Sequence, residues 1–281
     1  MSSDTSGRLG IAVAQFAPSN DKAANLTAIR ALASTAAERG AQLVVFPEYS
    51  AHFAEPLGPS ALAAAEPRGG EFVQGLGVIA AELGIHLVAG VIESSDASHY
   101  FNTLVALDPA GVLVASYRKI HLYDAFGARE SDWMHAGTVA PPETFTLGGF
   151  TVGLQTCYDL RFPEVTRWLV DAGVDLVLVP SEWVPGPTKE RHWNTLLAAR
   201  AIENTVFVAA ADHTAPGGVG LSQVLDPTGA VLSAIGAAPD VAVAFLDPAR
   251  LAGIRRTNPA LALRRFSVTP CLLYTSPSPR D

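Results

Sequence analysis

Apolar runs and amphipathic segments alternate along most of the chain. Residues 9–16 (LGIAVAQF) and 41–50 (AQLVVFPEYS) are short continuous apolar runs, a pattern typical of strands buried on both faces. Residues 71–84 have apolar positions at helical spacing and end at a glycine, which predicts an amphipathic helix. The elements predicted for the first half are strands over 9–16, 41–50, 85–93, 101–108 and 112–119, and helices over 25–40 and 71–84.

The second half of the chain repeats this plan. AGVDLVLVPSEW (172–183) is similar to RGAQLVVFPEYS (39–50), and the hairpin VLDPTGAVLSAIG (224–236) is similar to ALDPAGVLVASYR (106–118). A helical segment again precedes an apolar run, because TLLAARAIEN leads into TVFVAAADH. Two similar β/α halves predict a pair of sheets packed face to face, with helices on the outside.

The pattern predicts a single domain over residues 9–268. Residues 1–8 (MSSDTSGR) have no apolar pattern, and we expect them to form a flexible leader. The apolar pattern stops after Phe266, and residues 271–281 (CLLYTSPSPRD) resemble a translated sequencing adapter. We therefore expect this tail to be non-native, which leaves Cys157 as the one native cysteine.

Composition narrows the classes of function. With 49% hydrophobic and 16% charged residues, the 281-residue chain has enough apolar material for a large core. Its net charge of −8 argues against nucleic-acid binding, and it has no apolar run long enough to span a membrane. Two cysteines give no disulfide framework and the leader lacks signal-peptide features, so we expect a cytoplasmic protein. The seven histidines lack metal-ligand spacing, and we expect neither a metal nor a cofactor.

Cys157 has the most informative position in the chain. It lies between an apolar run at 151–155 and a predicted helix that begins near Pro163 and ends at Gly173. Most unpaired cysteines are small core residues. A thiol before a helix N-terminus is instead expected to have a pKa below its free value of about 8.5.

Two other reactive side chains also follow predicted strands. Glu48 comes after QLVVFP and Lys119 after VLVASYR, as Cys157 comes after TVGLQT. Each charged residue alone is more often a solvated strand end. Together the three side chains supply a nucleophile, a general base and a cation beside a developing oxyanion, which are the groups needed to cleave an amide covalently.

The motifs around these residues resemble one family. CYDLRFPE at Cys157, YRKIHLYD at Lys119, VVFPE at Glu48 and HWNTLLAARAIEN are similar to motifs of the nitrilase (carbon–nitrogen hydrolase) superfamily. The resemblance covers residues 9–266 and is closest to the branch of ω-amidase and deaminated-glutathione amidase. It implies an α+β fold, a four-layer α-β-β-α sandwich with two repeated halves, and a homodimer or higher homo-oligomer.

The resemblance also implies roles for individual residues. Glu48, Lys119 and Cys157 correspond to the catalytic triad, and Glu130 corresponds to a second glutamate of the family. The backbone N–H of Tyr158 is expected to complete the oxyanion site.

Some neighbouring residues have two interpretations. Trp183 and Tyr49 either line the substrate pocket or pack in the core. We expect Asp159 to cap a helix, and Arg161 and Glu164 to have structural ion-pair roles.

The leading hypothesis is an amidase that releases ammonia from a small carboxamide, a dicarboxylic acid monoamide, through a thioester. A nitrilase or an N-carbamoyl amidohydrolase would use the same triad. A cysteine/histidine hydrolase would use His121 as the base, but the papain-type signature is absent. A small-molecule-binding scaffold on the same fold is the non-enzyme alternative, and it would have no need of an activated thiol.

Overall fold

The computed structural model describes residues 7–271, which form two six-stranded sheets. The first sheet has the order β12-β1-β2-β3-β4-β5 and the second the order β11-β10-β9-β8-β7-β6. The strands are β1 (Leu9–Gln15), β2 (Leu43–Val45), β3 (His86–Ser94), β4 (Tyr100–Leu107), β5 (Leu113–Arg118), β6 (Phe145–Leu147), β7 (Phe150–Leu154), β8 (Leu176–Pro180), β9 (Phe207–Ala211), β10 (Gln223–Leu225), β11 (Val231–Ala234) and β12 (Asp240–Leu246). The helices are α1 (Lys22–Glu38), α2 (Pro59–Ala64), α3 (Glu71–Leu83), α4 (Pro163–Asp171), α5 (Lys189–Asn204) and α6 (Pro248–Thr257), with short 3-10 helices η1 (Glu130–Asp132) and η2 (Cys157–Arg161).

The strand pairing confirms the predicted repeat. In the first half β1, β2 and β3 are parallel neighbours, and β4 and β5 follow antiparallel. In the second half β7, β8 and β9 are parallel, and β10 and β11 follow antiparallel. Each half gains one antiparallel edge strand that the repeat did not predict: β12 pairs with β1, and β6 pairs with β7.

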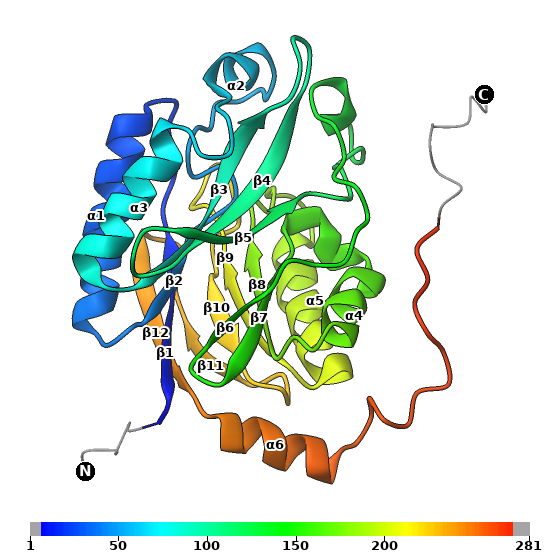
Figure 1. Ribbon diagram of the computed structural model, residues 1–281. Helices are drawn as coiled ribbons and strands as arrows, with labels where there is room; N and C mark the ends of the chain where they lie inside the picture. Colours follow the sequence, from blue (N-terminus) through cyan, green and yellow to red (C-terminus); the bar gives the residue numbers. More distant parts are fainter. Residues whose placement is uncertain (1–6, 272–281) are drawn as a thin grey trace.

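The layers follow the predicted α-β-β-α order. Helices α1 and α3 cover the first sheet, α4 and α5 cover the second, and the two sheets face each other between them (Figure 1). The central apolar cluster joins both sheets through residues such as Val13, Val88 and Leu178. Two further clusters lie between each sheet and its helices, so the fold buries three apolar layers.

Local sequence signals explain where the helices begin and end. Helix α1 begins three residues earlier than the predicted 25, because the Asp21 side chain accepts hydrogen bonds from the N–H groups of Ala23 and Ala24. Helix α3 ends as predicted at Gly84, which has a left-handed φ of 66°. Helix α4 begins at Pro163, where the absence of an N–H costs nothing.

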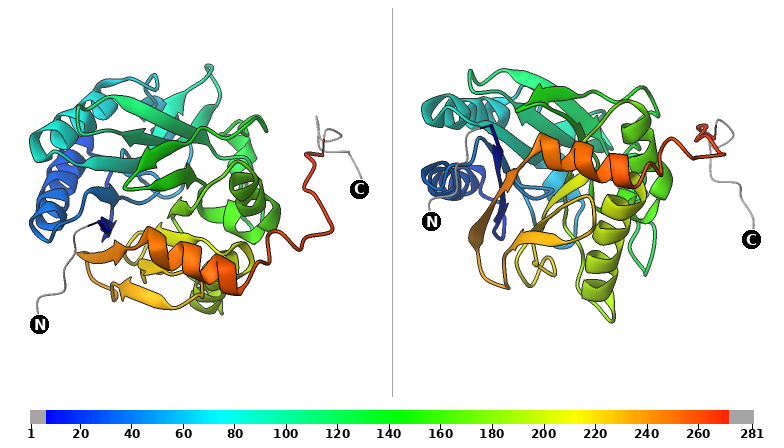
Figure 2. Two further views of the ribbon diagram at one scale, coloured as in Figure 1. Left: turned by 60° about the horizontal axis from the view of Figure 1, so that its bottom comes forward. Right: turned by 90° about the horizontal axis from the view of Figure 1, so that it is seen from below.

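The end of the described chain runs back over the sandwich. Strand β12 returns to the first sheet, α6 then lies across one end of both sheets, and residues 258–271 continue beside α4, where Arg264 contacts Asp171 (Figure 2). Of the predicted tail only exposed Cys271 is described, and residues 272–281 and 1–6 lie outside the described residues. No helix in residues 7–271 combines the length and hydropathy needed to cross a bilayer.

Candidate active site

The three reactive side chains converge where strands of both sheets end. Glu48 follows β2, Lys119 directly follows β5, and Cys157 follows β7. The parallel strands β2 and β7 belong to different sheets, so their facing carboxyl ends bring the turns after them together. Gly90 of β3 makes one of these turns possible, since a Cβ there would lie only 2.6 Å from the Cα of Glu48.

Glu48 is fully buried and accepts hydrogen bonds at both carboxylate oxygens. Its Oε1 accepts from Asn102 Nδ2 at 2.6 Å and from Lys119 Nζ at 3.0 Å. Its Oε2 accepts from the backbone N–H of Glu182 at 2.7 Å. Burial raises the pKa of Glu48, Lys119 opposes this and Glu130 adds to it, so the pKa stays above its usual value.

Lys119 is the cation that the two carboxylates share. Its Nζ lies 3.0 Å from Glu48 and 2.9 Å from Glu130, and the side chain is only 1% exposed. Burial alone would lower the pKa of Lys119, but Glu130 and Glu48 outweigh it and hold the pKa well above its usual value. Glu130, which the sequence placed here only by resemblance, also accepts from Tyr49 Oη at 2.8 Å and from the Tyr123 N–H at 2.7 Å.

Cys157 is the first residue of η2 and has a left-handed φ of 43°. Thr156 and Asp159 cap this short helix reciprocally, as the sequence predicted for Asp159. The thiol donates to the backbone carbonyl of Glu182 at 3.2 Å. A backbone held in a sparsely populated conformation is typical of functional sites.

The expected low pKa of this thiol is wrong. Burial, and then the nearby Glu48 carboxylate, raise the pKa of Cys157 well above its usual value. Cys157 belongs to a 3-10 helix of only five residues, and the longer helix α4 begins only at Pro163. The thiol therefore rests in its neutral form beside a base.

Glu182 is a further residue of the site. It was not predicted from the sequence, where its neighbour Trp183 was a candidate instead. Its backbone joins nucleophile and base, because its N–H donates to Glu48 and its carbonyl accepts from Cys157. Its side chain is buried, and Oε1 has no hydrogen-bond partner among the described residues. Burial first, then Glu48 and Asp212, raise the pKa of Glu182 well above its usual value.

A small cavity of about 10 Å³ opens onto the thiol. That volume accommodates roughly one water molecule. Its lining contains most of the predicted site residues together with two cations, namely Tyr123, Glu130, Cys157, Tyr158, Arg161, Glu182, Trp183, Val184 and Lys189.

The two aromatic residues with open interpretations differ in position. Trp183 lines this cavity, as one of the two interpretations proposed. Tyr49 is fully buried in an apolar cluster and does not line the cavity. Its hydroxyl donates to Glu130, so Tyr49 holds that carboxylate in place.

Arg161 and Lys189 bring positive charge to this cavity. The Arg161 Cζ atom lies 4.8 Å from the centroid of the Trp183 ring, and Lys189 Nζ donates to Tyr123 Oη at 2.7 Å. Among residues 7–271 neither cation has a carboxylate within salt-bridge distance. The expected structural ion-pair role of Arg161 and Glu164 is therefore wrong, and Glu164 is exposed.

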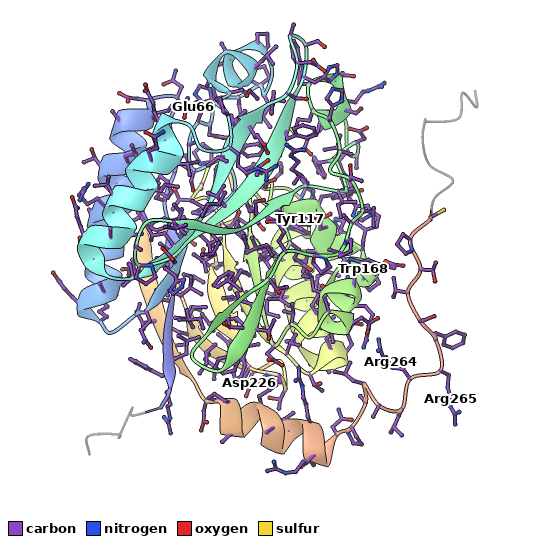
Figure 3. All side chains as sticks on the ribbon, viewed as in Figure 1. Glu66, Tyr117, Trp168, Asp226, Arg264 and Arg265 are labelled. Atoms are coloured by element: carbon purple, nitrogen blue, oxygen red, sulfur yellow. The ribbon has the colours of Figure 1, made fainter. Side chains whose placement is uncertain are left out.

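A larger cavity of about 570 Å³ lies elsewhere and does not include Cys157. Tyr117 and Trp168 line one side of this cavity, and residues 268–271 line the other. These four residues belong to the segment after α6, which also carries Arg264 and Arg265 (Figure 3). His121 lines this larger cavity, where its Nδ1 donates to Asp159 at 2.8 Å. Its position gives no support to the alternative in which His121 is the base for Cys157.

Comparisons with known proteins identify the family. The family described as carbon–nitrogen hydrolase matches residues 10–256. The chain belongs to the carbon–nitrogen hydrolase family. It is 35% identical over 260 residues to the deaminated glutathione amidase of Escherichia coli O157:H7, which covers 92% of this chain and 97% of that protein. It is 34% identical over 266 residues to the omega-amidase of Homo sapiens, covering 91% of this chain and 94% of that one.

Solved structures share the fold of this carbon–nitrogen hydrolase. The NitFhit protein of C. elegans superposes with a TM-score of 0.84 at 33% identity, over 92% of this chain and 65% of that longer chain. A variant amidase of Nesterenkonia sp. AN1 superposes with a TM-score of 0.77 at 31% identity, over 92% and 98% of the two chains. In that amidase the active-site cysteine carries the acetamide moiety of fluoroacetamide.

Two further residues of this carbon–nitrogen hydrolase were absent from the sequence prediction. Asn102 of β4 donates to the Glu48 carboxylate, and His213 donates from Nε2 to the Glu48 carbonyl at 2.6 Å. Both side chains are buried, Asn102 within β4 and His213 two residues beyond the end of β9. For Asn102 the available signal was a polar residue inside a predicted strand.

Proposed function

We propose that this carbon–nitrogen hydrolase is an amidase that releases ammonia from a small carboxamide bearing a carboxylate, with Cys157 as nucleophile. The observation that carries the proposal is that the Glu182 backbone contacts both groups, because its carbonyl accepts from the Cys157 thiol and its N–H donates to the Glu48 carboxylate. The similar amidases of Escherichia coli and Homo sapiens support the same reaction class. The covalent adduct on the cysteine of the Nesterenkonia amidase supports an acyl-enzyme.

Acylation begins with transfer of the thiol proton to Glu48. Because the pKa of Cys157 is raised by burial and by Glu48, a free thiolate does not accumulate in the resting site. The raised pKa of Glu48 makes its carboxylate a better proton acceptor than an exposed glutamate. Proton transfer and attack of sulfur on the amide carbonyl carbon therefore belong to one step.

Lys119 and the Tyr158 backbone N–H are proposed to stabilise the oxyanion of the tetrahedral intermediate. Lys119 is buried and held by two carboxylates, so its charge needs little reorganisation as the oxyanion forms. The intermediate then expels the amide nitrogen, which takes from Glu48 the proton that came from the thiol. The C–S bond of the thioester has replaced the C–N bond, and ammonia leaves.

Water completes the cycle by attacking the thioester. Glu48, ionised again after its proton went to the departing amide nitrogen, takes a proton from the water and then passes it to the expelled thiolate. The products are the carboxylic acid and the free Cys157 thiol. Glu48 thus accepts a proton and then donates it in each of the two half-reactions, and the net reaction consumes one water molecule.

A carboxylate on the substrate would meet the two cations of the cavity. Arg161 and Lys189 line the cavity that contains the thiol, and Arg161 Nε is buried without a hydrogen-bond partner among the described residues. A buried unpaired donor is costly, and an anionic group on the substrate would satisfy it. We therefore favour the monoamide of a small dicarboxylic acid over a neutral amide.

A matched substrate panel tests this proposal. The dicarboxylic acid monoamide should release ammonia with a kcat/KM at least about tenfold above that of the neutral amide of equal chain length. Replacing Arg161 by methionine should abolish this preference, whereas Arg167→Met should preserve it, because Arg167 of α4 donates to the Glu203 carbonyl and does not line the cavity. Efficient turnover of a nitrile or an N-carbamoyl amino acid, with no activity on any amide, would overturn the proposal.

We further propose a homodimer or higher homo-oligomer in the cytoplasm. The extended segment after α6 exposes Leu263 and Phe266, the latter to 90%, and a second copy would cover such side chains. Light scattering on the purified protein should give at least twice the chain mass, and Phe266→Ser should shift it toward the monomer. A monomeric parent protein at all concentrations would refute the oligomer.

A further inference from the structure

Two histidines and an aspartate meet on the surface, outside the cavity that contains Cys157. Asp96 and His99 lie in the connection between β3 and β4, and His135 lies just beyond η1. One potential ligand atom from each residue lies within 4.8 Å of the other two. This group is the only set of three such residues in the described part of the chain.

The two segments are fixed to each other by their backbones. The Tyr100 N–H donates to the Trp133 carbonyl at 3.1 Å, and the His135 N–H donates to the Tyr100 carbonyl at 3.0 Å. The rings of His99 and His135 stack with their centroids 4.4 Å apart and their planes 20° apart. Both imidazoles are therefore held side by side before any ligand arrives.

The carboxylate is oriented as well. Asp96 Oδ1 accepts from the N–H groups of Ser98 and His99 and from the Ser98 hydroxyl, at 2.8–2.9 Å. This leaves Oδ2 directed at His135, whose Nε2 lies 2.7 Å away. Hydrogen bonds that fix one carboxylate oxygen and present the other are typical of metal ligands.

We propose that Asp96, His99 and His135 form a binding site for one divalent transition-metal ion, with Zn²⁺ as the representative ion. Two imidazoles and one carboxylate suit Zn²⁺ and its neighbours, whereas Mg²⁺ and Ca²⁺ prefer oxygen ligands alone. Bonds of about 2.1 Å to a tetrahedral ion place two ligand atoms about 3.4 Å apart. The present ligand atoms all lie within 4.8 Å of one another, and the shortest separation, between Asp96 Oδ2 and His135 Nε2, is 2.7 Å. Side-chain exposures of 50%, 28% and 44% for the three residues leave the fourth position to water.

The ion would join the β3–β4 connection to the segment that supports Glu130. The Glu130 carbonyl accepts from the N–H groups of Trp133 and Met134, so this segment turns directly from Glu130 to His135. An ion held from both sides would resist separation of the two segments. Sequence spacing alone concealed the site, because His135 lies 36 positions after His99.

Calorimetric titration of the full chain with ZnCl2 tests the site. The protein should carry no polyhistidine tag, should be stripped with a chelator, and should have Cys157 and Cys271 replaced by alanine in every sample, because thiols also bind Zn²⁺. We expect one ion per chain with a dissociation constant on the order of 10 µM or tighter, a rise in melting temperature with added Zn²⁺, and no binding of Mg²⁺.

Variants locate the ion. Removing a hydrogen-bond partner of a metal ligand typically costs about 10–100-fold in affinity, so His99→Ala and His135→Ala should each weaken binding by at least about 100-fold. His192→Ala, at a histidine outside the group, should leave the affinity unchanged. Equal affinity in the parent, His99→Ala and His135→Ala, or no binding at 1 mM ZnCl2, would overturn the proposal. Melting curves without metal show whether each variant folds.

Discussion

Replacing Glu48 by glutamine should separate the loss of a base from the loss of a structural residue. Both oxygens of Glu48 accept hydrogen bonds, Oε1 from Asn102 and Lys119, and Oε2 from the Glu182 N–H. A glutamine NH2 group placed at either oxygen position would face a donor. The substitution thus removes the proton acceptor, breaks at least one buried hydrogen bond, and leaves Lys119 with Glu130 alone.

The two effects differ in size and in assay. Loss of general-base help should lower kcat by roughly 10²–10⁴-fold, or about 3–5 kcal/mol of transition-state stabilisation. Loss of the buried hydrogen bond should lower the free energy of unfolding by about 1–3 kcal/mol. For a chain of this size each kcal/mol lowers the melting temperature by about 2–4 °C. Ammonia release measures the first effect and thermal melting the second.

Asp226→Asn is the matched control for Glu48→Gln. Asp226 is also fully buried and accepts from Thr228, Ala230 and Arg250. It follows β10, which runs antiparallel to β9, and therefore lies at the opposite end of the second sheet from the site (Figure 3). This control should lose stability while keeping kcat within a few fold. Near-parental turnover by Glu48→Gln would refute its role as base.

Three other perturbations have defined outcomes. Lys119→Met should suppress acylation in rapid-quench experiments and, by leaving two buried carboxylates without a cation, cost about 3–5 kcal/mol in denaturant unfolding; an unchanged acylation rate would remove Lys119 from the mechanism. Burial lowers the pKa of His213 to about 4, so this neutral histidine contributes stability above its unfolded pKa of about 6.5 that is lost as the pH falls towards 4, at most about 3 kcal/mol. His213→Asn should flatten that pH profile, and an unchanged profile would contradict the assignment. Deleting residues 271–281 should change neither turnover nor melting temperature, whereas a large loss of stability would show that the tail contributes to the fold.

Local patterns were sufficient to predict the repeated strands and most of the helices. Val44 and Val177 occupy equivalent central strands, and both were recognisable from short apolar runs next to helical segments. Strand β12 was not recognisable in this way. Its pairing of Leu246 with Leu9 joins the two ends of the domain, and no signal in either segment encodes that register.

The site was predictable by residue type but not by environment. Glu48 and Glu182 have the same sequence signal, a glutamate after a buried strand. Only the packing of one sheet against the other, in which β2 contacts β9 and β3 contacts β8, brings Glu182 to Glu48 and buries both. The raised pKa of Cys157 has the same origin, because it depends on burial and on a carboxylate more than a hundred residues away in the chain.

Mass spectrometry of acid-quenched enzyme tests the central claim most directly. During turnover of a dicarboxylic acid monoamide, the peptide containing Cys157 should gain the mass of the acyl group, and the adduct should be lost with hydroxylamine as expected for a thioester. The adduct should be absent from Cys157→Ala, a variant that should fold but release no ammonia. Turnover without an adduct on Cys157, an adduct on another residue, or activity in Cys157→Ala within about tenfold of the parent would contradict the mechanism.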